Sequence, residues 1–239
     1  MFIGHFAVGF AAKRAAPQLS LAILFVAAQL ADLLWPIFVA VGLEHVRIDP
    51  GNTAVTPLDF ISYPYSHSLA TLVAWGVALG LIVVRMEPDS ASARSTSATP
   101  RALTFGIVVA LVLSHWLLDW MTHRPDMPLY PGGPKFGMGM WNSVAVTVTV
   151  EVAMFAAGVW IYARSTRARD GVGRWSFGVF VLLLLAIYAG NVAGPPPPSV
   201  AALVVAGIAG AAVIVAWSAW FDRHRDRADA ESMSHTPRT

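Results

Sequence analysis

Long apolar segments dominate this chain and limit what it can fold into. A helix that crosses a membrane needs roughly 20 consecutive apolar residues. Hydrophobic residues make up 56% of the 239 positions and charged residues only 13%, about half the charged share of a soluble domain. Five segments are long enough to cross, and a sixth follows the break "GPPPPS"; they lie at about 18–43, 66–86, 102–122, 142–163, 174–193 and 199–221.

These segments predict an all-α, polytopic membrane helix bundle with about six transmembrane helices. The N-terminal "MFIGHFAVGFAA" is apolar but too short to span before Lys13 and Arg14. A signal peptide would carry its positive charge in front. We therefore expect a short N-terminal half-helix tucked into the bundle, in a single transmembrane domain over 1–221 with a charged tail over 222–239.

The loops differ in character. Residues 87–101, "EPDSASARSTSATPR", are rich in Ser, Ala and Pro and predict a flexible connector. The tail from 222 alternates in charge, which is typical of a solvated, partly disordered end. The loops 44–65 and 123–141 are instead rich in Pro, Gly and aromatic residues, and we expect them to be ordered, as lids.

The distribution of positive charge orients the predicted bundle. If Lys13 and Arg14 are cytoplasmic and the connections alternate, 13 of the 16 Lys and Arg residues lie on one side. Only Arg47, Arg124 and Lys135 lie on the other. Because cytoplasmic loops carry the excess of Lys and Arg, we expect a multi-pass protein of the cell (inner) membrane with a cytoplasmic C-terminus.

The composition also excludes some chemistry. The chain has no cysteine, so disulfides, thiolate nucleophiles and thiolate metal sites are excluded. The net charge of +2 is small, and nothing indicates nucleic-acid binding. The oligomeric state has no signal in the sequence.

Ionisable residues inside the apolar segments are the strongest functional signal. In "VLSHWLLDWMTH", three such residues recur at a spacing of four and so share one helix face. A carboxylate at the bilayer centre costs roughly 2.5–3.5 kcal/mol, so each needs a compensating partner. The residues in or at the edge of spans are His5, Asp32, His67, His115, Asp119, His123 and Glu151.

Their depth suggests that they meet. In the predicted topology His67, His115, Asp119 and His123 lie near the outer ends of their helices, and the element of His5 faces the same side. Imidazole and carboxylate groups are good Zn²⁺ ligands. The pattern therefore predicts a metal site that faces the extracytoplasmic side.

Each residue also has a simpler interpretation. His115 and Asp119 could form an ordinary hydrogen bond on a helix surface, and His5, His67 and His123 could be interfacial polar residues. Glu151 could be a ligand, could support one, or could be a protonated acid beside Thr147 and Thr149. Asp32 has the weakest simple explanation, since a lone Asp in a span needs a partner. Solvation in an aqueous loop or tail explains the remaining candidates, His45, Asp49, Asp59, His224 and His235, although the first three could also contribute to a lid.

Four motifs in order resemble those of a known family. "GH" near the N-terminus, "ADLLWP", "SHSL" and "SHWLLDWMTHRPDMPLYP" look like the YdjM-type membrane-bound metal-dependent hydrolases. The resemblance covers residues 1–135. "DLL" keeps only the first of the family's usual acid pair, and "YPYSHS" lacks the basic residue often found before the histidine.

A looser resemblance, to helical zinc phospholipases C and single-strand nucleases, implies roles for these residues. It makes His5, Asp32, His67, His115 and Asp119 metal ligands, with Asp119 as a candidate bridge between ions and Glu151 as a substitute for a later ligand pair that is absent here. The implied cofactor is one to three Zn²⁺ ions, with two favoured and Mn²⁺ as an alternative. The implied activity is hydrolysis of a phosphoester-like bond in a lipid, a lipid-linked precursor or a periplasmic solute by metal-activated water, with Asp32 and Asp119 as catalytic residues.

Three other functions remain open from the sequence. Intramembrane acids also occur in proton- or ion-coupled transporters. His67 and His115 could be axial ligands of a haem, although converging carboxylates argue against this. The chain could also be a catalytically inactive scaffold.

Overall fold

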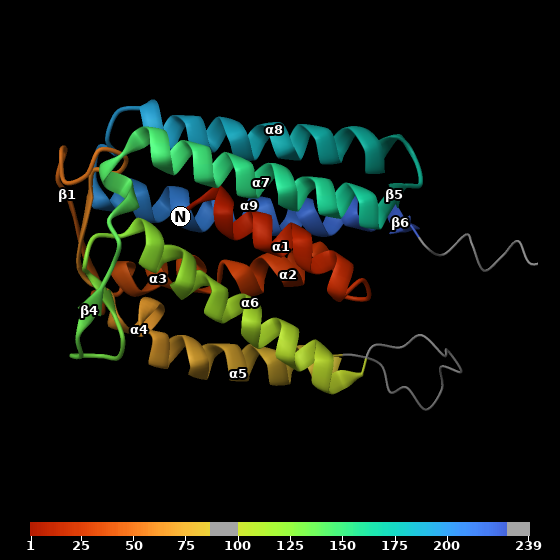
Figure 1. Cartoon of the computed structure of the whole chain (residues 1–239), viewed down its shortest axis with the longest axis horizontal. Coiled ribbons are helices and arrows are strands. Elements are labelled where there is room, and N and C mark those ends of the chain that lie inside the picture. The colour runs from red at the N-terminus through yellow and green to blue at the C-terminus, as the bar shows by residue number, and fades with distance from the viewer. Residues whose placement is uncertain (87–99, 229–239) are drawn as a thin grey trace, which may run out of the picture.

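The computed structural model describes residues 1–86 and 100–228. Its helices run roughly along one long axis, and the short strands lie at the two ends of the bundle (Figure 1). The elements are α1 (Ile3–Ala15), α2 (Leu21–Ala28), α3 (Leu30–Ala40), β1 (His45–Ile48), β2 (Leu58–Ser62), α4 (Pro64–His67), α5 (Leu69–Met86), α6 (Arg101–Thr122), β3 (Met127–Pro128), β4 (Lys135–Phe136), the 3₁₀ helix η1 (Met140–Asn142), α7 (Val144–Ser165), β5 (Thr166–Ala168), α8 (Gly171–Ala193), α9 (Val200–Asp222) and β6 (Arg225–Arg227).

The predicted fold class is confirmed, with one difference. In the described chain α5, α6, α7, α8 and α9 are each long and apolar enough to cross a membrane, and α1 is the expected short N-terminal helix. The segment 18–43, predicted as one span, consists of α2 and α3, which meet at a bend of 60°. Within the described residues the chain thus has the character of a multi-pass membrane protein, with five helices that could each cross the bilayer and one bent pair.

Side-chain caps explain where several helices begin. Ser20, Ser143, Asp170 and Ser199 each accept a hydrogen bond from the backbone N–H three residues further on, at the starts of α2, α7, α8 and α9. Such a cap satisfies one of the N–H groups that a helix leaves without a partner in its first turn.

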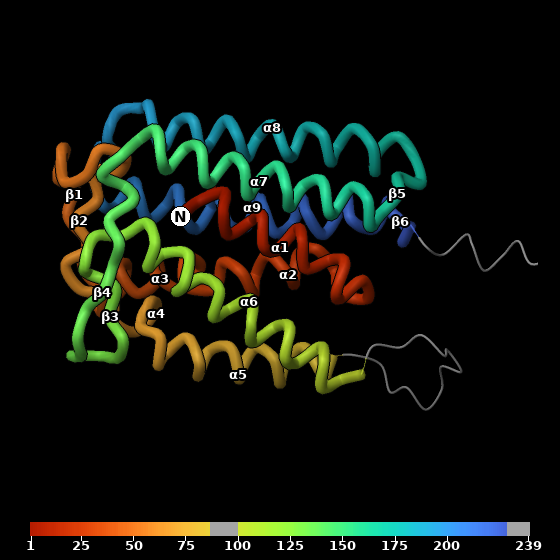
Figure 2. The backbone as a smooth tube through the Cα atoms, viewed as in Figure 1, coloured from red at the N-terminus to blue at the C-terminus, as the bar shows by residue number. Residues whose placement is uncertain are grey.

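The two ends of the bundle are different. At one end, called here the site end, β1 pairs with β2 and β3 with β4, and α4 lies beside them (Figure 2). The predicted loops 44–65 and 123–141 are therefore ordered. At the other end, called the opposite end, β5 pairs with β6. The turn between α1 and α2 also lies there.

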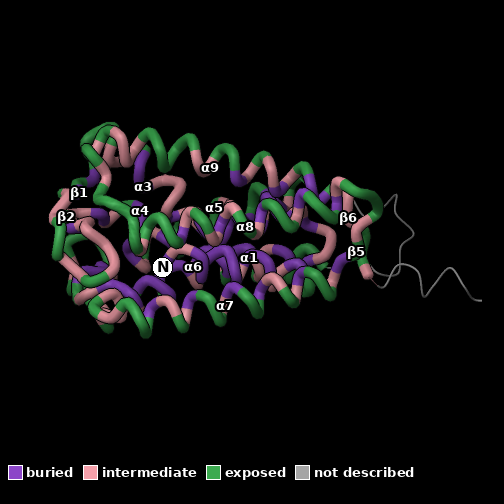
Figure 3. Tube along the Cα trace, turned by 90° about the horizontal axis from the view of Figure 1, so that it is seen from above, coloured by how far each residue is buried: buried purple, intermediate pink, exposed green. Residues whose placement is uncertain are grey.

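Helix α1 lies inside the bundle, against α7, α2 and α6. Its contact with α7 is close: a Cβ atom at Gly158 would lie 2.3 Å from the carbonyl oxygen of Ala7. Phe6 and Phe10 of α1 pack edge to face against Phe25 of α2. Buried residues concentrate along α1 and α6, whereas α9 is mostly exposed (Figure 3).

The exposed surface fits a bilayer. Many large apolar side chains of the spans face outward, among them Leu182 and Val205. Exposed aromatic residues cluster near both ends of the spans, as at membrane–water interfaces. They are Tyr65, Trp120 and Tyr130 at the site end and Trp160, Trp175 and Trp220 at the opposite end.

A buried polar cluster joins four helices at the opposite end. Lys13 Nζ lies 2.6 Å from Asp222 Oδ2, the Tyr162 hydroxyl donates to Asp222 Oδ1 at 2.7 Å, and the Leu21 N–H donates to Oδ2 at 2.9 Å. The first residues of the predicted charged tail, 222–228, are therefore packed against the bundle through Asp222 and β6. The rest of that tail, 229–239, and residues 87–99 of the predicted connector lie outside the described residues.

Candidate metal centre

Separate elements bring the predicted residues together at the site end. His5 lies on α1, Asp32 in the first turn of α3, His67 at the end of α4, and His115 and Asp119 on α6. His123 follows the last residue of α6. The break after α2 places Asp32 at a helix N-terminus, where a negative charge is favoured.

Asp119 lies at the centre of the cluster. Its Oδ1 is 3.0 Å from His5 Nε2, and its Oδ2 is 3.1 Å from His115 Nε2. The same Oδ2 lies 3.8 Å from His67 Nε2 and 3.9 Å from His123 Nε2. The rings of His5 and His115 are stacked, with centroids 3.7 Å apart. The two carboxylate oxygens of Asp119 thus face different sets of imidazoles.

Asp32 completes the cluster from the other side. Its Oδ1 is 3.5 Å from His67 Nε2 and 3.8 Å from His115 Nε2. Its side chain is 41% exposed, whereas those of His115 and Asp119 are 0% and 3% exposed. Asp32 is therefore the more exposed of the two carboxylates in this cluster.

Two sets of donor atoms in the described chain are compact enough to hold a metal ion. They are His5, Asp32 and His115, and His67, His115 and Asp119; within each set the ligand atoms lie within 4.8 Å of one another. Nitrogen and oxygen donors without sulfur suit Zn²⁺ and Mn²⁺.

Outer hydrogen bonds fix which nitrogen of each ring faces the cluster. His115 Nδ1 is 2.9 Å from the carbonyl oxygen of Ala28, the last residue of α2, which the helix break leaves without an intrahelical partner. A carbonyl can only accept, so Nδ1 carries the proton. In the neutral form of His115, the lone pair of Nε2 therefore faces the two carboxylates.

His67 is oriented through a two-step relay. Ser66 donates its hydroxyl proton to Glu44 at 2.6 Å, so its oxygen accepts from His67 Nδ1 at 2.7 Å. Glu44 is fully buried and also accepts the backbone N–H groups of Tyr65 and Ser66. Metal-ligating histidines commonly donate their second ring nitrogen in this way.

The residues present fit a metal ion. Nε2 of His115 is buried and makes no hydrogen bond within the described chain, although Asp119 Oδ2 is 3.1 Å away. A nitrogen lone pair that faces a carboxylate oxygen at this distance is unfavourable unless a cation compensates for it. A divalent ion held by these donor sets would supply that compensation.

His123 belongs to the edge of the cluster. Its Nδ1 contacts Asp126 Oδ1 at 2.9 Å, and the Tyr63 hydroxyl donates to the same oxygen at 2.6 Å. Burial lowers the pKa of His123, against the raising effect of Asp126, and so favours the neutral ring. Burial raises the pKa of the Tyr63 hydroxyl, and Asp126 raises it further, so Tyr63 remains a donor. His123 is not a member of either compact donor set, so its role as a ligand stays a prediction.

Glu151 has a supporting position. Its Oε2 accepts the N–H groups of Phe2 at 2.8 Å and Gly4 at 3.3 Å, which holds the start of α1 and thereby His5. The amino group of Met1 contacts Asp119 beside it. Thr147, considered as a partner of Glu151, instead donates to the carbonyl of Met140. Glu151 is also outside both donor sets, and its role as a ligand likewise stays a prediction.

The remaining candidates lie elsewhere. His45 is exposed on β1, and His224 pairs with Asp170 at the opposite end. Asp59, assigned to solvation from the sequence, is instead buried and bonded to Arg47 and Arg124. His235 lies outside the described residues.

Sequence patterns missed Glu44, Ser66, Tyr63 and Asp126. Ser66 stands next to a predicted ligand and Asp126 three residues after one, so proximity was a usable signal for these two. Glu44 and Tyr63 lie in loops, where the sequence has no periodicity from which the positions of side chains could be predicted.

Comparison of the chain with protein-family models, curated proteins and solved structures gives no match. The function of the site must therefore be inferred from its own geometry.

Proposed function

We propose that this protein is an integral membrane metal-dependent hydrolase that cleaves phosphoester-like bonds, with Asp32 and Asp119 as its catalytic residues. One observation carries the proposal: imidazole nitrogens from three elements each lie within 4 Å of a carboxylate oxygen of Asp32 or Asp119, beside a cavity. Buried ionisable residues in a membrane protein are costly and are usually functional.

Zinc is the proposed cofactor, with manganese as the alternative. His5, Asp32, His67, His115 and Asp119 would hold it, and the opposed directions of the two Asp119 oxygens suit a bridge between two ions. Zinc, when bound, lowers the pKa of a water ligand to about 7, which supplies a nucleophile at neutral pH.

Side chains of the protein would carry out the remaining steps of the reaction. Asp32 Oδ atoms face the cavity, so Asp32 is placed to accept a proton from the attacking water. Asp119 is buried among the histidines and positions them. The positive-inside rule places the site on the extracytoplasmic side of the cell membrane, since most Lys and Arg residues belong to the opposite end.

The alternatives fit the site less well. A transporter needs a polar path across the bilayer, yet below the site the rings of Phe6, Phe10, Phe25, Phe155 and Phe180 fill the described core. A haem between His67 and His115 has no space, because Asp119 lies within 3.8 Å of both Nε2 atoms. Flux through liposomes that depends on Asp32 would favour the transporter instead.

The first test is metal content. Full-length protein purified in detergent should contain near-stoichiometric zinc or manganese by elemental analysis, and His115→Ala should lose most of it because both donor sets share this residue. His45→Ala, on an exposed strand, is the matched control and should keep the metal. Metal-free wild-type protein, or an unchanged metal content in His115→Ala, contradicts the proposal.

The second test is hydrolysis. Asp32→Asn should lower the rate on bis(4-nitrophenyl) phosphate by about 100-fold or more, as expected for loss of a proton acceptor. A wild-type protein that holds metal but does not cleave this phosphodiester argues for an inactive scaffold.

A further inference from the structure

The cavity beside the candidate metal centre is much larger than the centre needs. Its volume is about 910 Å³, near the upper end of the range for cavities that enclose a drug-sized ligand. Asp32, His67, Asp119 and His123 line one part of the wall. Gln29 lines it as well, and its buried Oε1 has no hydrogen-bond partner in the described chain.

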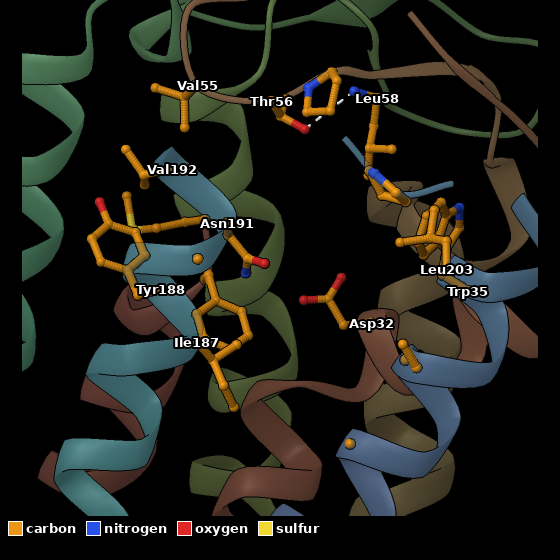
Figure 4. A pocket seen from close by; sticks show the side chains of 18 of the residues that line it. Asp32, Trp35, Val55, Thr56, Leu58, Ile187, Tyr188, Asn191, Val192 and Leu203 are labelled. Atoms are coloured by element: carbon orange, nitrogen blue, oxygen red, sulfur yellow. Dashed lines mark hydrogen bonds between the residues drawn. The ribbon is translucent and has the colours of Figure 1, made fainter. Parts of the chain in front are cut away.

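Apolar side chains of α8 and α9 form a large part of the rest of the wall. Ile187 and Val192 of α8 lie on one side and Leu203 of α9 lies opposite, with the Asp32 carboxylate between them (Figure 4). Further along α9 the cavity is lined by Ile214 and Val215, more than two helical turns beyond Leu203. The cavity is therefore amphiphilic, with a polar end at the centre and an apolar end between helices.

The packing of α8 and α9 explains why a cleft exists there. Near the opposite end the two helices are in direct contact, through the rings of Phe180 and Phe221 at 5.1 Å and a hydrogen bond from Trp217 to Ser176 at 2.6 Å. Toward the site end the corresponding parts of both helices line the cavity instead. The connection at Pro195–Pro198 also lines it.

Several residues of α9 that face the cleft are small and take up little of its space. Ala206, Gly207, Gly210 and Ala211 all line it. A Cβ atom at Gly210 would meet no heavy atom within 4 Å, so the space in front of this residue is open.

A loop at the site end forms another part of the wall. Residues 50–51 and 53–58 line the cavity, and Val55 and Thr56 lie above Asp32 in the view of Figure 4. Arg124 holds this loop in place through hydrogen bonds to Asn52 and Asp59. The apolar end, by contrast, is walled by α9, most of whose surface faces outward where lipid would lie.

We propose that the cleft between α8 and α9 binds the hydrocarbon chain of the substrate, and that the substrate is a membrane lipid with a phosphoester head group. The head group lies at Asp32 and the histidines, and the chain runs along Leu203, Gly210 and Ile214. The assignment of the head group rests on the proposed function, whereas the assignment of the chain rests on the cavity alone. Acyl and prenyl chains share this chemistry.

The test compares two identical substitutions. Gly210→Leu places a side chain in the cleft. Gly178→Leu, on the exposed face of α8 with no heavy atom within 4 Å of its Cβ position, is the matched control. Both variants should keep the metal content of the wild-type protein, because neither residue contacts a ligand of the centre.

Binding of the chain is measured without catalysis. A lysophosphatidic acid and a prenyl phosphate, each with a diazirine in the chain, are cross-linked to the detergent-purified full chain, and the labelled residues are mapped by mass spectrometry. At least one probe should label 187–192 and 203–215, and which one does so distinguishes acyl from prenyl lipids. Labelling should fall at least tenfold in Gly210→Leu and stay unchanged in Gly178→Leu.

The outcomes separate this inference from the proposed function. Equal labelling of the cleft in Gly210→Leu and wild type, or labelling confined to the outward surface of α9, overturns the lipid-binding cleft. If the wild-type protein contains no metal but shows the expected labelling pattern, the proposed hydrolase function is contradicted and the lipid-binding cleft is supported.

Discussion

Three histidines at the site end owe their orientation to acceptors that do not belong to the cluster itself. A backbone carbonyl, a serine hydroxyl and a carboxylate hold the Nδ1 atoms of His115, His67 and His123. Each Nε2 then points inward with its lone pair available. The affinity for a metal ion should depend on these acceptors almost as much as on the ligands.

Ser66 offers the sharpest test of this dependence. Ser66→Ala removes the acceptor of His67 Nδ1 and should weaken metal binding by roughly 10–100-fold without abolishing it. Ser114→Ala is the matched control, because Ser114 precedes a ligand but bonds only to the carbonyl of Leu111 in its own helix. Competition with a chelator of known affinity measures both. Equal affinities in the two variants would show that the relay through Ser66 has no role.

At the scale of elements, the sequence predicts the helices that carry these residues better than it predicts where those helices break. The spacing of His115, Asp119 and His123 correctly placed three side chains on one face, because helical periodicity is a local property. The break between α2 and α3 was missed, since Gln29 stands between alanine and leucine without a nearby Gly or an adjacent Pro. That break is set by tertiary contacts, among them the hydrogen bond from His115 to Ala28.

The loop over the cavity gives a prediction at the scale of elements. Arg124→Ala removes the contacts that join the 123–141 loop to Asn52 and Asp59, so hydrogen exchange in residues 50–58 should accelerate. Arg47→Ala breaks a bond to the same Asp59 carboxylate, but from within the β1–β2 hairpin, and should have a smaller effect. Faster exchange in Arg47→Ala than in Arg124→Ala would contradict this role of Arg124.

At the scale of the whole molecule, hydropathy predicted which segments span the membrane but not which helices pack against one another. Lipid-facing and core-facing residues of these helices are similarly apolar, so no stripe distinguishes the packed face. Leu182 and Val205 face outward while Leu184 and Val108 are buried. The position of α1 between α7 and α2 depends on small residues such as Gly158, whose importance becomes clear only from the packing.

The polar cluster at the opposite end should contribute strongly to global stability. Asp222→Ala leaves Lys13 buried without its partner and should lower the free energy of unfolding by about 3–5 kcal/mol. Asp226→Ala, which breaks an exposed pair with Arg169, should change it by less than about 0.5 kcal/mol. Chemical unfolding in detergent micelles measures both values. Similar stabilities of the two variants would refute the assignment.

The enclosed position of α1 has a consequence for biogenesis. This helix is made before α7, is too short to cross the bilayer, and finds its closest packing partner only in α7, which ends at Ser165. Glu151 of that same helix secures the backbone beside His5. The candidate metal centre can therefore be completed only after α7 has been made, because the helix that carries His5 depends on a later helix for its position.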